Sequence, residues 1–599
     1  MAFRKADIGL IKRWVGGVDY DSDPFEVPRD CLIDASNILP ANQTGAIAQR
    51  SGFLKYNNTV ISEGGVAKSI NGLASVIIGG AEFFLAQAGT KFYNGVSATW
   101  SDISGSCTFT DNYNNLTSFA VLENVLYFRN RNNDGLFLWS GTGNVAQVAS
   151  GQIYSVQVHS GGGGNGYVVG DILTVAGGTG GKVLVTGITG AGVVSTIIIY
   201  VDGSSVSWNG SGYSVGNNIA TTGGTGVGAS IDILQIFTPA QAALLTTFNG
   251  ALWSFMDPNN PLLGYFSDGS VNSLGNPATN FLLFDQGQGW RVQGAVPYGV
   301  GQMLVFKDKS VTLVQSTGSV PAYIKSVFCD GVGCVSHQSI VTLPGGSVMW
   351  WDIDDIYMCS GNLVQSATVH PVVGTPRLRN FFKTMVNPSR LQYVVGVYYQ
   401  SLGIVRWWYS PKGKNTNVAH IDYHIATKSF WPGTTSGNAA CQRIIANQSL
   451  LYSGDVNGYS YQQDYLTSDD GGPITANAQI PWNYFEGLMI RKKGILFEVV
   501  TSIQGPYGLQ VDFFFDQSST PQMINQSMSF QALSGPEWDV AQFDVDQWPV
   551  ESSLFDSNCP ISRLFKTFSA NIHNSGIDTP WAVYAINVVE RPLQVTAGT

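Results

Sequence analysis

Apolar residues in this chain either alternate with polar ones or occur in short runs that Gly, Asn, Asp and Pro interrupt. Alternation with period two, and short apolar runs bounded by turn residues, are typical of β-strands. Helical spacing is scarce, and we expect only a turn or two of helix at residues 239–247 and 378–391. The pattern therefore predicts an all-β chain built from many short strands.

One unit recurs loosely: a strand, a tight turn with Asn, Gly or Asp, a second strand rich in aromatic residues, and another turn. Seven stretches fit this description: residues 70–95, 119–141, 244–269, 299–318, 341–361, 393–432 and 444–464. Units of about 30–45 residues have the period of a propeller blade, whose small sheet must be covered by neighbouring blades. We predict a β-propeller of six to eight blades over residues 61–151 and 237–470. The alternative is a set of unrelated hairpins in sandwiches.

A sharper repeat interrupts this pattern at residues 152–236. Two segments, GNGYVVGDILTVAGGTGGKVLV and GSGYSVGNNIATTGGTGVGASI, align with an offset of 46 residues. The offset pairs Tyr167 with Tyr213, Gly170 with Gly216, Gly177 with Gly223, and Gly178 with Gly224. Glycines at fixed offsets are expected to supply turns with positive φ between short strands. We predict an inserted two-repeat β module that projects from the propeller, because loops tolerate insertions.

The pattern changes again after about residue 470. Longer strands are expected at residues 493–504, 508–516, 561–573 and 581–592. They indicate a C-terminal β-sandwich-like domain over residues 471–599. Between them, residues 533–558 are polar and acidic with interspersed aromatic residues. This stretch is either an interaction surface, which we favour, or a connection laid across the domain.

Composition fits short strands joined by many turns. Glycine accounts for 70 of 599 residues, and charged residues make up only 12%. The formal net charge is −10 without a basic stripe, which argues against sequence-specific binding of nucleic acid, although an acidic surface can let DNA slide past. The seven scattered cysteines are expected to be free thiols. Neither a signal peptide nor a membrane-spanning run is evident, so we expect folding in a cytoplasm.

The chain opens on a distinctive segment, VPRDCLIDASNILPANQTGAIAQRSGFL, at residues 27–54. Strand-type isoleucines flank a turn, which predicts that residues 1–60 form an N-terminal segment with a hairpin that closes the ring of blades. Arg50 would then be either a buried structural partner or exposed. The residues that carry the motif are Asp34, Asn37, Arg50, Gly52 and Phe53.

This opening resembles one found in many tailed-phage structural proteins. With the aromatic hairpins and the β-rich end, the chain resembles the nozzle, or tail hub, proteins of short-tailed bacteriophages. The resemblance covers most of the chain in architecture but only about 30 residues in motif. It implies a homo-oligomeric ring of six subunits in the virion tail, below the connector or portal protein. It also implies contacts with tail fibres and with passing DNA that do not depend on sequence. The inserted module likewise resembles decorations of phage structural proteins.

Several clusters suggest a catalytic or metal-binding site, but each has a simpler interpretation. His420 and His424 are four apart on an expected strand, which separates them by about 13 Å. Asp352 and Asp354 roughly meet the separation of a glycosidase carboxyl pair, but acidic turn residues are the simpler interpretation. Cys329 has only Cys334 as a nearby ligand. We therefore predict no catalytic residues, no metal and no cofactor.

The aromatic pairs Trp350-Trp351 and Trp407-Trp408 could stack on sugars, although one member of each pair is expected in the core because neighbours on a strand point to opposite faces. The leading hypothesis is a structural tail protein that retains and conducts DNA. The alternatives are a receptor- or glycan-binding tail protein and, less favoured, a polysaccharide-degrading tail enzyme.

Overall fold

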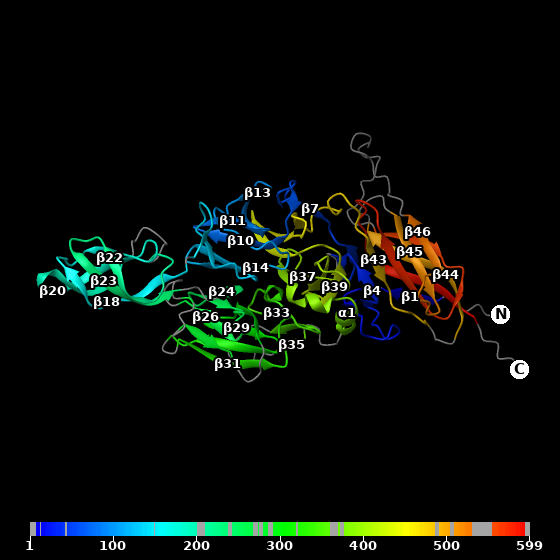
Figure 1. Ribbon diagram of the computed structural model, residues 1–599. Helices are drawn as coiled ribbons and strands as arrows, with labels where there is room; N and C mark the ends of the chain where they lie inside the picture. Colours follow the sequence, from blue (N-terminus) through cyan, green and yellow to red (C-terminus); the bar gives the residue numbers. More distant parts are fainter. Residues whose placement is uncertain are drawn as a thin grey trace.

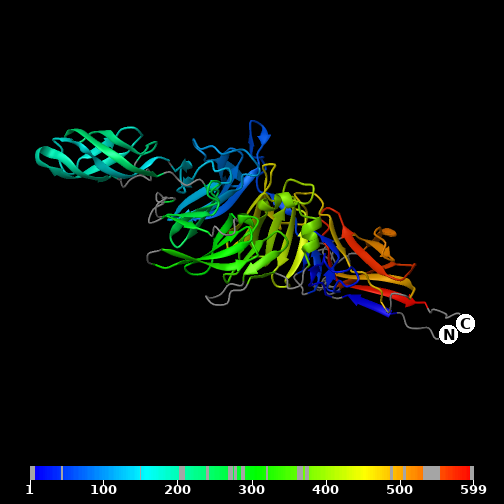
Figure 2. The same ribbon diagram turned by 60° about the horizontal axis from the view of Figure 1, so that its bottom comes forward.

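The chain forms three β-rich parts in a row, an inserted module, a propeller and a sandwich (Figures 1 and 2). The computed structural model describes residues 7–11, 13–41, 45–148, 150–200, 210–237, 242–267, 274, 280–284, 291–318, 322–359, 369–371, 377–485, 490–502, 508–529 and 554–593. Both ends of the chain lie beside the sandwich, and the module lies at the far end of the molecule.

The central part is a propeller of seven four-stranded antiparallel sheets among the described residues. The first three blades are β10 (Ile70–Ile78), β11 (Ala81–Ala88), β12 (Lys91–Val96), β13 (Thr99–Asp102); β14 (Thr117–Leu122), β15 (Val125–Asn130), β16 (Phe137–Trp139), β17 (Ala146–Gln147); and β24 (Leu244–Phe248), β25 (Ala251–Phe255), β26 (Leu263–Phe266), β27 (Phe281–Leu283). Each of the seven units predicted from the sequence lies within one blade.

The remaining blades follow the same order from the centre outwards. They are β28 (Val292–Pro297), β29 (Gln302–Lys307), β30 (Ser310–Ser316), β31 (Tyr323–Asp330); β32 (Val341–Thr342), β33 (Val348–Trp351), β34 (Ile356–Cys359), β35 (Val369–Pro371); β36 (Val395–Tyr399), β37 (Ile404–Tyr409), β38 (Ala419–His424), β39 (Ser429–Gly433); and β40 (Ala439–Ile445), β41 (Gln448–Gly454), β42 (Ser460–Gln463), β7 (Phe53–Lys55). The first strands of neighbouring blades contact one another around most of the ring, β28 contacts the 3₁₀ turn just before β32, and β40 returns to β10.

Each blade packs against a neighbouring blade on both of its faces, and this determines the burial of the tryptophan pairs. Trp350, Trp351, Trp407 and Trp408 are all fully buried. Trp350 packs with Phe306 of the preceding blade, whereas Trp351 packs towards Trp407 of the following blade. We expected one member of each pair in the core, and both are buried, because alternation places side chains against two neighbouring blades and not against core and solvent.

The ring is closed by an N-terminal strand, but not by the hairpin that the sequence suggested. The hairpin forms from β5 (Ile38–Pro40) and β6 (Ile47–Gln49), and β6 pairs with β50 (Ala582–Pro592) of the sandwich. The next strand, β7, pairs with β42 and completes the last blade. The N-terminal segment is therefore shared between the two parts: β7 closes the propeller, and the hairpin before it belongs to the sandwich.

The sandwich consists of two sheets. One contains β1 (Asp7–Ile11), β5, β6, β44 (Lys492–Ser502), β47 (Leu554–Pro560), β48 (Leu564–Phe565) and β50. The other contains β4 (Asp34–Ser36), β43 (Ala476–Gln479), β45 (Gly508–Phe515), β46 (Met523–Ser529) and β49 (Phe568–Asn574). Phe497 and Phe513 meet edge to face between the sheets, with ring centroids 5.2 Å apart. Most of the predicted acidic stretch at residues 533–558 lies outside the described residues, which resume at Leu554.

The module is a single six-stranded sheet system joined to the propeller by the long ribbon of β18 and β23. Its elements are β18 (Gln152–Asn165), β19 (Ile172–Val175), β20 (Lys182–Thr189), η1 (Gly190–Gly192), β21 (Val193–Ile199), β22 (Gly216–Thr222) and β23 (Val227–Phe237). The two repeats exchange their tyrosines: Tyr213 packs on the glycine turn of the first repeat at Gly178, and Tyr167 packs on that of the second at Gly226. Both tyrosines are buried in the module core.

The repeat glycines have two different roles. The sequence predicted positive φ at all of them, and Gly170, Gly177, Gly223 and Gly224 have it. Gly178 and Gly216 do not. Gly178 is required for another reason, because a Cβ atom there would lie 2.6 Å from the ring of Tyr213.

Helices are few among the described residues. The helix expected near residues 378–391 is present as α1 (Arg379–Thr384) and the 3₁₀ helix η5 (Pro388–Tyr393). Of the helix expected at residues 239–247, residues 239–241 lie outside the described residues, and the rest is wrong, because Leu244–Phe248 forms β24 as the first strand of a blade. A further 3₁₀ turn, η4 (His337–Ser339), precedes β32, and small pairs form from β2 (Gly17–Val18) with β3 (Cys31–Leu32) and β8 (Ser62–Glu63) with β9 (Val66–Ala67). Within the part of the chain that is described, no helix has the length and apolarity to cross a membrane.

Candidate functional site at the propeller–sandwich junction

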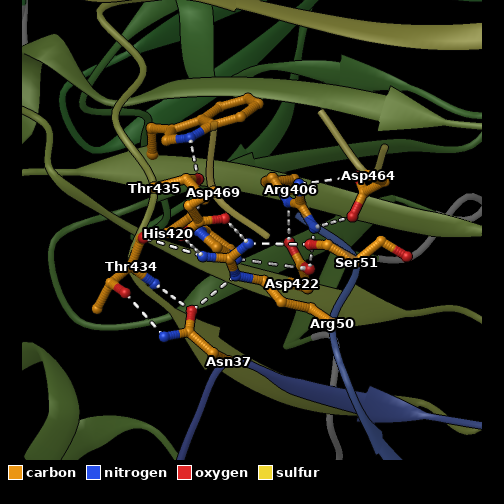
Figure 3. A network of polar contacts seen from close by, with 11 residues as sticks. Asn37, Arg50, Ser51, Arg406, His420, Asp422, Thr434, Thr435, Asp464 and Asp469 are labelled. Carbon is orange, nitrogen blue, oxygen red and sulfur yellow. Dashed lines mark hydrogen bonds and ion pairs between the residues drawn. The ribbon is translucent and has the colours of Figure 1, made fainter. Parts of the chain in front are cut away.

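Two segments connect the sandwich to the propeller. The first runs from β6 into β7, and the second runs from β42 back to β43. Arg50 lies in the first segment and Asp469 in the second. The Arg50 guanidinium donates to both carboxylate oxygens of Asp469, from Nη1 at 2.8 Å and from Nη2 at 2.7 Å (Figure 3). The side chain of Arg50 is only 2% exposed, so the sequence alternative of a buried structural partner is the one found.

Asn37 fixes the remaining edge of this guanidinium. Its Oδ1 accepts from Arg50 Nε at 2.8 Å and from the backbone N–H of Thr434 at 2.8 Å. Its Nδ2 donates to Thr434 Oγ1 and to the Thr475 carbonyl. Asn37 has a φ of 57°, a left-handed conformation that Asn adopts more readily than most residues. One side chain thus ties the sandwich hairpin to blade six and to the second crossing segment.

A second buried cation lies beside the first. Arg406 on β37 is completely buried and donates to Asp422 Oδ1 at 2.7 Å and to Asp464 Oδ2 at 2.9 Å. Arg406 and Asp422 are directly opposite in the register of β37 and β38. The two carboxylates outweigh the effect of burial and raise the pKa of Arg406 above its ordinary value, so this guanidinium stays charged. Asp464 follows β42, which links the pair to the last blade.

His420 completes the network as a neutral group. Its Nδ1 shares a hydrogen bond of 2.8 Å with Thr435 Oγ1, which also accepts from Trp408 Nε1 at 3.0 Å. Burial, with the positive charges of Arg406 and Arg50, lowers the pKa of His420 well below its ordinary value. The junction therefore holds two charged arginines, three carboxylates and one imidazole that does not take a proton at neutral pH.

The other motif residues also have structural contacts. A Cβ atom on Gly52 would lie 1.9 Å from the carbonyl oxygen of Ser468, so only glycine allows the two crossing segments to touch. Phe53 packs edge to face on Tyr461 of the last blade, with centroids 4.9 Å apart. Asp34 accepts from Asn477 Nδ2 at 3.1 Å within the sandwich. The structure brings Asn37, Arg50 and Gly52 together and leaves Asp34 apart.

The residues weighed as catalytic or metal-binding lie elsewhere. His424 bonds Thr427 at 2.7 Å and lines a cavity of about 550 Å³ beside the N-terminal segment, away from the partners of His420. Asp352 is buried and accepts from the Gly333 N–H at 3.3 Å, whereas Asp354 is exposed in the same turn. All seven cysteines are free thiols. Across the described ranges, no three His, Cys, Asp or Glu residues gather in a way that would hold a metal ion.

Sequence reasoning missed most of the partners in this site. Asp469, Asp464, Asp422 and Arg406 were not singled out as structural residues. One signal was present: a lone charge in the middle of the aromatic strand IVRWWY, which forms β37, and another in HIDYH of β38. A charge inside a fully apolar strand requires a buried counter-charge, and the two strands are adjacent in the chain.

The propeller also contains a central cavity of about 390 Å³. It is lined by the first strands of five blades, β10, β14, β28, β36 and β40, together with His337 and Gln338 of η4. Its lining mixes polar residues, among them Asn71, Thr117 and Asn438, with apolar ones such as Leu73 and Val76.

The seven radial sheets and the strand that closes them define the chain as a β-propeller protein. No protein-family model and no curated protein matches it. Among solved structures, it is similar to the computationally designed Ika8 protein at 10% identity and a TM-score of 0.32, covering 67% of this chain and 98% of that one.

It is also similar to YCF48 from Cyanidioschyzon merolae at 8% identity and a TM-score of 0.29, covering 69% and 98%. An ancestral GH74 enzyme matches at 9% identity and a TM-score of 0.26, covering 75% and 77%. These likenesses are distant and concern the propeller fold alone.

Proposed function

We propose that this chain is a structural protein of a bacteriophage tail, one subunit of a ring-shaped nozzle below the connector. In this role the subunit retains and conducts DNA and anchors tail fibres. Its work is mechanical: it keeps its shape while packaged DNA presses on the ring and then passes through it. The chain's role is therefore structural and not catalytic.

The observation that carries the proposal is the ion pair between Arg50 and Asp469 at the junction of propeller and sandwich. The residues behind the resemblance to nozzle proteins, Asn37, Arg50 and Gly52, are the ones that join the closing strand of the propeller to the sandwich. A ring subunit under load needs its domains fixed relative to one another. A doubly hydrogen-bonded, buried Arg–carboxylate pair supplies directional rigidity that a few apolar contacts do not.

The placement of the module is consistent with this role. It leaves the propeller between the second and third blades, whereas the sandwich packs through β4 and β5 on β39, the outermost strand of blade six. The two additions therefore extend from the propeller in opposite directions (Figure 1). Such a subunit can pack against neighbours through its propeller and still present the module to a further partner.

The test is the assembly state of the purified full-length chain. Native mass spectrometry and negative-stain imaging are performed on the chain alone and on the chain mixed with the connector protein from the same genome. The proposal expects a six-fold ring with a central hole, formed alone or only on the connector. A trimer, or a monomer that ignores the connector and binds cells or glycans, contradicts it and favours the receptor-binding alternative.

A further inference from the structure

Three segments meet at one end of the propeller cavity and bring cationic and polar side chains together. Arg131 directly follows β15, the second strand of blade two, whereas η4 and η5 precede the first strands of blades five and six. In an antiparallel blade the end of the second strand and the start of the first lie at the same edge. Arg131 links η4 to η5 beside the cavity: its Nη2 donates to Gln338 Oε1 at 3.2 Å and to the Gln392 carbonyl at 2.5 Å.

Tyrosine rings cover the faces of two guanidinium groups here. The Arg390 guanidinium carbon lies 3.9 Å from the ring centroid of Tyr393 and 5.3 Å from that of Tyr113. The Arg131 carbon lies 5.1 Å from the same Tyr393 ring. Stacking occupies the planar faces and leaves the N–H edges for hydrogen bonds. A ligand would therefore accept hydrogen bonds from these N–H edges.

Part of the hydrogen-bonding capacity of the cluster is not used within the described chain. Arg390 is 8% exposed, and its Nε is buried without a hydrogen-bond partner. His337 Nδ1 is also buried and lacks a partner among the described residues. Buried polar atoms of this kind are rare in folded proteins, and each needs a physical reason.

The positive charge is not neutralised either. Arg50, Arg406 and Arg443 each have a carboxylate partner. By contrast, no carboxylate of the described residues forms an ion pair with Arg131 or Arg390. Burial, with the nearby charges of Arg291 and Arg390, lowers the pKa of Arg131 to about 10. In a chain with a net charge of −10, an enclosed cationic cluster without a counter-ion is a local exception.

We propose that this end of the propeller cavity binds the oxyanion of a small ligand, a carboxylate or a phosphate group, between Arg131 and Arg390. A guanidinium presents parallel N–H donors that match both oxyanions. His337 and Gln338 line the cavity together with Val76, Val121 and Val296, and Gln338 accepts from Arg131, so the cluster adjoins the cavity through Gln338. The cavity of about 390 Å³ is in the range of small-molecule sites, so the body of the ligand lies within the propeller.

The test is isothermal titration calorimetry of the full-length chain with two probes, inorganic phosphate and glutarate. One site per chain is expected for at least one probe, and the preferred probe tells whether the natural group is a phosphate or a carboxylate. Arg131→Gln and Arg390→Gln are each expected to weaken binding by about tenfold or more. The control is Arg563→Gln, which removes an exposed arginine that stacks on Phe515 of the sandwich and should leave the affinity unchanged.

A variant that folds poorly is replaced by Arg390→Lys, which keeps the charge and loses the planar fork. Hydrogen exchange of the unmodified chain, with and without phosphate or glutarate, adds a second readout: protection should rise in η5 and at residues 131–133. The proposal is overturned if neither probe binds at tens of millimolar, or if binding survives both substitutions. It is also overturned if a single-stranded oligonucleotide binds far more tightly through the same arginines, because the site would then recognise a nucleic-acid backbone.

Discussion

Arg50 and Asp469 lie 419 residues apart in the chain and form a two-point ion pair between the only two described segments that join the sandwich to the propeller. The pair is the centre of the junction. Asn37 holds the third edge of the guanidinium, and Gly52 lets the segments touch. Propeller closure and sandwich attachment therefore depend on the same few residues.

Replacing Arg50 with Met is expected to lower the free energy of unfolding by about 3–5 kcal/mol, because Asp469 would keep its charge in a largely buried position without a partner. Urea denaturation followed by tryptophan fluorescence and by far-UV circular dichroism measures the loss. If the junction couples the unfolding of the propeller to that of the sandwich, the transitions recorded by the two probes should coincide in the unmodified chain and separate in the variant.

The chain contains a matched control for this change. Lys55 and Asp470 lie on the same two segments and form an ion pair of 2.7 Å, but their side chains are 32% and 28% exposed. Lys55→Met should cost less than about 1 kcal/mol, since an exposed pair contributes little. Similar losses for the two variants would show that burial of the Arg50 pair is not what stabilises the junction.

Gly52 provides a steric test of the same contact. In Gly52→Ala the new Cβ would lie 1.9 Å from the Ser468 carbonyl oxygen, and the Gly52 backbone is held in place by hydrogen bonds to Leu466 and Tyr465. A loss of about 1–3 kcal/mol is expected from the forced separation. Gly508→Ala is the control, because nothing lies within 4 Å of the position that its new Cβ would take, and the change should stay within about 0.5 kcal/mol.

The sequence predicted the blades well because their signals are local. The Asn249-Gly250 turn is an example: both residues have positive φ, at 50° and 72°, and they join β24 to β25 as the Asn-Gly pair indicated. The alternation of apolar residues on either side then identifies two strands. Seven such units in succession are enough to infer a propeller.

The junction could not be predicted in the same way. Nothing near Arg50 in the chain reveals Asp469, since the two residues meet only after seven blades have closed. The hairpin at residues 38–49 reads as an independent closing element, yet β6 finds its partner in β50 near the other end of the chain. Trp407 and Trp408 show the limit of a local rule, because alternation gives the two faces of a strand but not what covers each face.

The module offers a comparison between its two equivalent tyrosines. The Tyr213 hydroxyl donates to the Val175 carbonyl at 2.9 Å and accepts from the Gly181 N–H at 3.0 Å. The Tyr167 hydroxyl accepts from the Ala229 N–H at 3.2 Å. Tyr213→Phe is expected to cost about 2 kcal/mol and Tyr167→Phe about 1 kcal/mol, in proportion to the buried hydrogen bonds lost.

Hydrogen exchange in the full chain, read at residues 172–189 and 227–237, measures these effects within the module alone. Exchange in the blades should not change in either variant, because the ribbon of β18 and β23 is the connection between the two parts. Faster exchange in the blades would contradict the description of the module as a separately packed unit.

Asp352 should destabilise the folded chain at alkaline pH. It is 7% exposed, its Oδ1 is buried without a hydrogen-bond partner, and burial raises its pKa to about 6. The folded-state pKa lies above the unfolded value of about 3.9, so the folded chain holds this proton more tightly. Ionisation above pH 6 therefore opposes folding, and below about pH 4 both states are protonated and the effect disappears.

Asp352→Asn is expected to raise the free energy of unfolding by about 1–2 kcal/mol at pH 8, less than the full effect of the pKa shift because the new amide is itself buried. The gain should shrink as the pH falls through 6 and vanish near pH 4, as measured by urea denaturation at each pH. Asp354→Asn, in the exposed part of the same turn, is the control and should change stability little at any pH. A constant gain at all pH values would mean that the effect of Asp352 does not arise from its charge.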